Sequence, residues 1–95
     1  METKLQSEII KWLKGKGAYV IKTHPGMGTP TGCPDIIFLF EGAWGAIEVK
    51  AHAKAPWGIG QEATINHLNV WSPFVWKVYP ENWAEIKAQL ISQFF

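Results

Sequence analysis

Apolar residues recur at three- and four-residue spacing near the start of the chain, which predicts an amphipathic helix. The positions are Leu5, Ile9, Trp12 and Leu13. Gly15 and Gly17 follow and mark the end of this helix. A short helix is expected over residues 61–70. Asn82, with Glu85 three residues later, resembles a capping box and predicts a last helix over roughly 83–93, with Ile86, Leu90 and Ile91 on its apolar face.

Short runs rich in β-branched and aromatic residues predict strands between these helices. The runs cover residues 18–23, 35–40, 46–51 and 74–79. The Gly- and Pro-rich stretches 24–34 and 52–60 predict loops, and a turn from Glu41 to Gly45 predicts an antiparallel hairpin. We therefore expect one α/β domain over residues 1–95, with an α-β-β-β-α-β core, a central mixed sheet flanked by helices, and a C-terminal helix.

Strand alternation brings charged side chains of this hairpin together. Glu48 and Lys50 share one face of their strand because successive side chains point to opposite faces. A two-residue turn at Glu41-Gly42 would place Asp35 opposite Glu48, and a four-residue turn would place it opposite Lys50. Either even-length turn gathers the three charged groups on one face, whereas an odd-length turn would separate them.

Two carboxylates on one face disfavour each other's ionisation, and a divalent cation removes that cost. Oxygen ligands from Asp35 and Glu48 suit Mg²⁺ or Mn²⁺. Such a metal polarises a phosphoryl oxygen and lowers the pKa of a bound water, and Lys50 can stabilise the developing negative charge. The pattern predicts hydrolysis of phosphodiester bonds. Taken singly, each of these residues is also compatible with a solvent-exposed strand position.

Two further residues have both a functional and an ordinary interpretation. Glu8 lies between Leu5 and Trp12 on the apolar stripe of the first helix, where it either faces a charged group or reaches solvent at the edge of the stripe. Gln61 opens the helix after the 52–60 loop, where it either holds a water or phosphate oxygen or serves as a polar helix-start residue.

These residues resemble the motif of the PD-(D/E)XK nuclease superfamily. The matching segments are Gly32-Cys33-Pro34-Asp35, Gly45-Ala46-Ile47-Glu48-Val49-Lys50 and Gln61. The resemblance extends from Glu8 to about Tyr79 and is greatest to the stand-alone VRR-NUC domains of phages. It implies a metal bound by Asp35, Glu48 and the backbone carbonyl of Val49, with Lys50 catalytic. It also implies that Glu8 and Gln61 complete the site.

The resemblance implies a homodimer that acts on branched DNA, such as a four-way junction. The chain has six Trp, and with Phe94 and Phe95 they exceed what one small core is expected to absorb. An interface between two copies would bury the excess. The expected interface positions are Trp44, Trp57, Trp71, Trp76 and the C-terminal helix.

Composition narrows the mode of recognition. The net charge of this 95-residue chain is +1, and every cationic residue except the histidines is Lys, which excludes bidentate reading of guanine by Arg. A DNA ligand would be recognised by backbone and shape. One Cys excludes an internal disulfide, and the charged N-terminal segment predicts a cytoplasmic protein without a membrane anchor.

Two other functions fit parts of the pattern. The chain could be a DNA-binding or assembly module that shares the fold without the chemistry. It could also be a two-carboxylate hydrolase of another substrate, such as a glycosidase. Lys50 on the same face as the carboxylates favours an anionic phosphate substrate over a sugar.

Overall fold

The computed structural model describes residues 2–24, 26 and 28–94. The elements are α1 (Glu2–Gly15), β1 (Tyr19–Lys22), β2 (Ile36–Phe40), β3 (Ala43–Val49), α2 (Gln61–Trp71), β4 (Val75–Val78) and α3 (Trp83–Phe94). The strands form one sheet in the order β1-β2-β3-β4, in which β3 and β4 are parallel and the other pairs antiparallel. The expectation of an α/β fold with a mixed sheet is confirmed.

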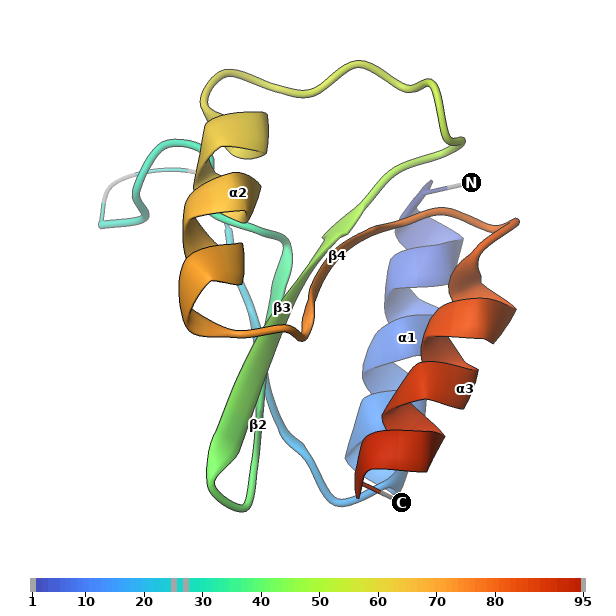
Figure 1. The fold of residues 1–95 in the computed structure, drawn as a ribbon. Coiled ribbons are helices and arrows are strands. Elements are labelled where there is room, and N and C mark those ends of the chain that lie inside the picture. The colour runs from blue at the N-terminus through green and yellow to red at the C-terminus, as the bar shows by residue number, and fades with distance from the viewer. Residues whose placement is uncertain (1, 25, 27, 95) are drawn as a thin grey trace.

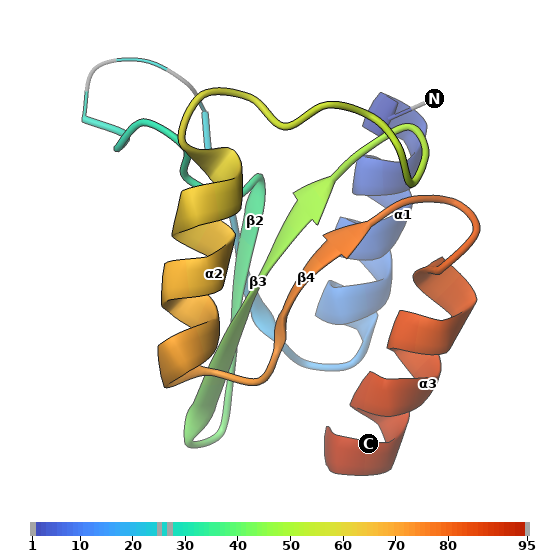
Figure 2. The same cartoon turned by 45° about the horizontal axis from the view of Figure 1, so that its top comes forward.

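Helices cover both faces of the sheet. α1 and α3 lie side by side on one face, and α2 lies on the other (Figures 1 and 2). The larger core forms between the sheet and the α1–α3 pair, where the rings of Trp12 and Trp83 meet edge to face at 5.5 Å. A smaller core under α2 contains Ala46, Ile65 and Val75. Alternation along β2 and β3 separates these two cores, as expected for a sheet buried on both faces.

The hairpin between β2 and β3 has the two-residue turn. Phe40 pairs with Ala43 across Glu41-Gly42, and Gly42 adopts a positive φ of 71°. Continued by one pair beyond Ile36 and Ile47, this register places Asp35 opposite Glu48. The predicted turn of Glu41 to Gly45 is wrong in length, because β3 begins at Ala43.

Gly45 lies inside β3, although the sequence suggested that it belongs to the turn. A Cβ atom on Gly45 would lie 2.3 Å from Cζ of Phe38, so glycine is needed here to leave room for the aromatic ring of the neighbouring strand. The other end of the predicted strand is also wrong, because β3 ends at Val49. Lys50 nevertheless stays at the sheet, since its amide donates to the carbonyl of Val78 at 2.8 Å.

The three helices all belong to these layers, and the longest of them, α1, has 14 residues. Within the described ranges, no helix has the length and apolar character needed to cross a bilayer.

Candidate active site

Glu48 lies at the centre of the candidate site, on the sheet face that α2 covers. It occupies the second-last position of β3, and only 2% of its surface is exposed. Asp35 directly precedes β2 and lies on the same face by the hairpin register. Buried carboxylates are rare in proteins unless they are paired or bind a cation. The contacts of Glu48 are therefore informative about function.

Gln61, the first residue of α2, connects Glu48 with Lys50. Its Nε2 donates to Oε2 of Glu48 at 2.7 Å, and its Oε1 accepts a hydrogen bond from Nζ of Lys50 at 2.8 Å. Nζ of Lys50 is also 3.5 Å from Oε2 of Glu48. The three side chains form a closed ring of contacts. The reverse amide orientation would put oxygen against carboxylate and nitrogen against ammonium, so the network selects one orientation.

Asp35 is held by backbone groups at the edge of the hairpin. Its Oδ2 accepts a hydrogen bond from the amide of Val49 at 2.8 Å. Pro34 lies opposite Val49 in the continued register, and its carbonyl accepts from Oγ1 of Thr23 at 2.6 Å. Because proline has no amide hydrogen, the ladder offers no donor to the Val49 carbonyl. That carbonyl remains available to another ligand.

The oxygen atoms at this place fit a hard divalent cation. Oε1 of Glu48 is buried and has no hydrogen-bond partner among the described residues. A buried acceptor without a donor costs free energy, and coordination of a cation would remove this cost. The Asp35 carboxylate and the Val49 carbonyl supply further oxygen ligands, which Mg²⁺ and Mn²⁺ prefer.

The electrostatics of Glu48 also favour a cation. The pKa of Glu48 is raised from 4.5 to about 7, because burial and the negative charge of Asp35 raise it more than Lys50 lowers it. Without a cation, this carboxyl group therefore exchanges its proton near neutral pH. A divalent cation would hold it in the ionised form.

Glu8 lies elsewhere. α1 packs on the opposite face of the sheet, and Oε2 of Glu8 accepts a hydrogen bond from Nε1 of Trp83 at 3.1 Å. Across the described ranges, no three His, Cys, Asp or Glu side chains are grouped so that they could hold a metal. The structure thus brings together Asp35, Glu48, Val49, Lys50 and Gln61, and it places Glu8 between two helices.

A cavity of about 510 Å³ opens beside Asp35 and Gln61. Its other walls come from the segment after β1 and from the turn before α2. The described residues of these walls are Thr23, Gly26, Thr29, Pro30, Thr31, Gly32, Cys33, Gly58 and Ile59. The predicted loop 24–34 therefore borders the site, and its residues 25 and 27 lie outside the described part.

Gly32 and Gly60 bring these two walls into backbone contact. A Cβ on Gly32 would lie 2.6 Å from the carbonyl carbon and oxygen of Gly60, and Gly32 has a positive φ of 82°. Both features require glycine at this position. Since Gly60 directly precedes α2, the contact fixes Gln61 relative to Asp35.

Lys77 and Gly58 also support the site, and the sequence interpretation missed them. Nζ of Lys77 donates to the carbonyls of Ala53 and Ala55 at 2.7 and 3.2 Å and lies 4.9 Å from the ring centre of Trp57. The amide of Gly58 donates to Oε1 of Gln61. Lys77 pairs with Glu48 in the parallel register. The sequence places Lys77 in a strand, but it does not specify this pairing.

Cys33 contributes a thiol to the cavity wall. Burial raises the pKa of Cys33, and the nearby charges of Glu48 and Asp35 add to this shift, while a hydrogen bond with Thr23 opposes it. The thiol is therefore protonated and weakly nucleophilic at neutral pH.

Comparison with known proteins gives no matching family model, no matching curated protein and no matching solved structure. The arrangement of Asp35, Glu48, Lys50 and Gln61 is therefore the basis on which a function can be argued.

Proposed function

We propose that this protein is a metal-dependent nuclease that hydrolyses phosphodiester bonds in DNA, with a core like that of the PD-(D/E)XK nucleases. One observation carries the proposal. Glu48 is buried next to Asp35 and Lys50, and one of its carboxylate oxygens has no hydrogen-bond partner in the described part of the chain. Its neighbours Asp35 and Gln61 line an open cavity.

The residues of the site have distinct roles in this proposal. Asp35, Glu48 and the Val49 carbonyl would hold Mg²⁺ or Mn²⁺, which supplies Lewis acidity and an activated water when bound. Gln61 holds the Lys50 ammonium through its Oε1. Lys50 thereby places a positive charge beside two carboxylates that would otherwise repel a phosphate.

The cavity walls suit a phosphate backbone. Thr29 and Thr31 carry hydroxyl groups that can donate to phosphate oxygens, and the glycine backbone of the same segment permits close approach. Without Arg and with a net charge of +1, the protein would select DNA by backbone and shape. We propose branched DNA as the preferred substrate on this ground.

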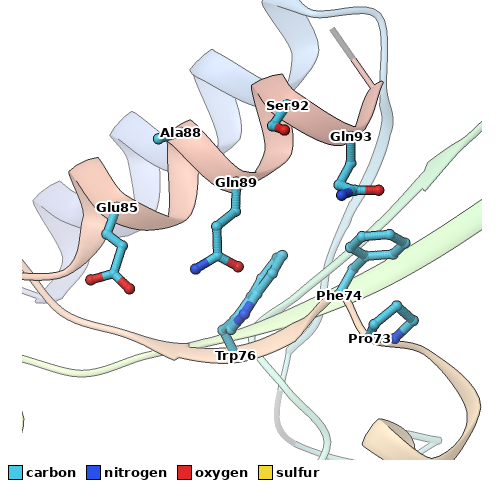
Figure 3. A pocket seen from close by; sticks show the side chains of 8 residues that line it. All are labelled: Pro73, Phe74, Trp76, Glu85, Ala88, Gln89, Ser92 and Gln93. Atoms are coloured by element: carbon cyan, nitrogen blue, oxygen red, sulfur yellow. The ribbon is translucent and has the colours of Figure 1, made fainter.

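Symmetric cutting of a four-way junction needs two sites, which a two-fold homodimer would supply. Of the expected interface residues, Trp71 is 66% exposed, whereas Trp44, Trp57 and Trp76 are half-buried. Phe95 lies outside the described residues. Trp76 and Phe74 form the floor of a cavity of about 490 Å³ beside α3, which could receive a partner's side chain (Figure 3).

Light scattering would test this oligomeric state. We expect twice the chain mass of 10.7 kDa at micromolar concentration. A monomer that cuts linear duplex as readily as a junction would contradict both the dimer and the preference for branches.

Cleavage of a panel of labelled duplex, flap, splayed and four-way substrates tests the function. We expect cleavage with Mg²⁺ or Mn²⁺, binding without turnover in Ca²⁺, and no cleavage by Asp35→Asn. Glu41→Gln is a matched control, because Glu41 is an exposed carboxylate at the far end of the hairpin. Full activity in EDTA would refute the metal requirement. Junction binding without cleavage under every cation would favour the DNA-binding module.

A further inference from the structure

Ile59 is an apolar side chain in an unusual place. It is 88% exposed, more than any other large hydrophobic residue in the described part of the chain. Of the exposed large hydrophobic residues in that part, it is the one that lines the cavity at Asp35 and Gln61. The others lie on β1, β2, α2 and α3, away from this wall. An isolated exposed isoleucine is unremarkable on a surface, but here it borders the proposed site.

The backbone on both sides of Ile59 is anchored. Gly58 donates its amide to Oε1 of Gln61, and its carbonyl accepts from the amide of Gln61 at 3.1 Å. Gly60 has a positive φ of 74°, and its carbonyl accepts from the amide of Thr64 in the first turn of α2 at 3.0 Å. Isoleucine is itself stiff at χ1 because it is branched at Cβ. The side chain is therefore held out at a fixed position.

The segment that leads to Ile59 is tied to the sheet as well. Lys77 binds the carbonyls of Ala53 and Ala55 and lies over the ring of Trp57. Lys77 is the strand partner of Glu48. The position of Ile59 is thereby fixed relative to the carboxylates from both directions along the chain.

We propose that Ile59 is a wedge that inserts between unstacked bases of DNA next to the phosphate held at Asp35 and Glu48. This inference rests on the proposed function, in which DNA occupies the cavity. Among the described lining residues, Asp35 carries the one charge, so Ile59 presents an apolar surface that suits the faces of bases. Proteins that bend or open DNA use isoleucine and similar side chains in this way.

The size of the wedge selects the substrate. Burial of one aliphatic side chain yields about as much free energy as the loss of one base-stacking contact costs. In an intact duplex the two effects nearly cancel. At a branch, flap or nick the stack is already interrupted, so burial of Ile59 is a net gain. A single isoleucine thus gives a preference for interrupted duplexes without any base-specific contact, in a chain that has no Arg.

The test uses 2-aminopurine, whose fluorescence increases when it is unstacked. The base is placed either next to the branch point of a flap substrate or within intact duplex, and binding is measured in Ca²⁺. We expect wild-type protein to raise the fluorescence at the branch. Ile59→Ala should abolish this rise and reduce the affinity ratio of flap to duplex by about tenfold. Ile59→Leu should restore much of both.

Val70→Ala is the matched control, since Val70 is 79% exposed on α2 and does not line the cavity. It should leave fluorescence and affinity ratio unchanged. Because Ile59 is so exposed, Ile59→Ala should fold normally, which circular dichroism checks.

The outcomes separate the wedge from the nuclease. Unchanged fluorescence and an unchanged affinity ratio in Ile59→Ala would overturn the wedge. The wedge would also be overturned if Ile59→Ala changed the oligomeric mass in light scattering while its DNA binding stayed normal, because Ile59 would then be an interface residue. Wild-type protein that cleaves DNA but never unstacks the base also overturns it while the nuclease stands. Wild-type protein that unstacks the base but does not cleave in Mn²⁺ refutes the nuclease and supports the wedge.

Discussion

The amide of Val49 donates a hydrogen bond of 2.8 Å to the carboxylate of Asp35, which joins the end of β3 to the start of β2. Asp35 is thus a backbone partner as well as a proposed metal ligand. Asp35→Asn keeps an acceptor and should retain the stability of the fold. Asp35→Ala leaves the buried Val49 amide without its partner and should lower the free energy of unfolding by about 1–3 kcal/mol. Urea denaturation measures this difference, and equal stabilities would show that the contact contributes little.

Lys50→Ala should separate catalysis from metal binding, because Lys50 is not a proposed ligand. We expect the single-turnover cleavage rate to fall by about 10²–10³-fold. Mn²⁺ affinity, measured by calorimetry, should change little. Lys14→Ala is the control, since Lys14 is exposed in the last turn of α1. Near-normal rates in Lys50→Ala would reduce Lys50 to a structural partner of Gln61.

The raised pKa of Glu48 predicts a pH-dependent stability. Its ordinary value is 4.5, and the folded protein raises this pKa to about 7. The folded state therefore keeps the proton to a higher pH than the unfolded chain does. Without a cation, stability should fall as pH rises from about 4.5 to about 7, by up to about 3 kcal/mol. Glu48→Gln should remove this part of the pH dependence in urea denaturation.

The same group predicts the pH dependence of cation binding. Because the cation needs the ionised carboxylate, the affinity for Mn²⁺ should increase with pH up to about 7 and then level off. Calorimetry across this range would measure it. An affinity independent of pH would mean that Glu48 is not a ligand.

Glu8 can be tested by two substitutions. Glu8→Gln keeps an acceptor for Nε1 of Trp83 but removes the charge, so it should weaken Mn²⁺ affinity less than Asp35→Asn does. Glu8→Ala should instead cost about 1 kcal/mol of stability, because the buried Trp83 loses its partner. A greater loss of metal affinity for Glu8→Gln than for Asp35→Asn would reverse this order.

Element order and strand alternation were predictable because they depend on local patterns. The face shared by Asp35 and Glu48 followed from the even turn alone. The start of β3 could not be predicted in this way, because Gly45 resembles a turn residue in the sequence. Its reason for being glycine, the close contact with the ring of Phe38, is visible only in the folded structure. Asn82 likewise resembles a helix cap, yet its side chain bonds backwards to the amide of Tyr79 and the carbonyl of Lys77.

The contacts around Gln61 depend on distant parts of the chain. Gln61 was identified from its position, but its partners follow from the path of the 52–60 loop and the place of α2 on the sheet. The role of Lys77 requires the parallel pairing of β4 with β3, which no local pattern specifies. The link from Glu8 to Trp83 joins residues 75 positions apart.

Cys33 gives this protein a built-in attachment point. It is the one cysteine of the sequence, and it lies in the wall of the cavity. A thiol-reactive dye would therefore label every molecule at the same place, without any engineered residue. Because burial raises the pKa of Cys33, labelling should be slow at neutral pH and faster in alkaline buffer. The labelled protein would report entry of any ligand into the cavity as a change in dye emission.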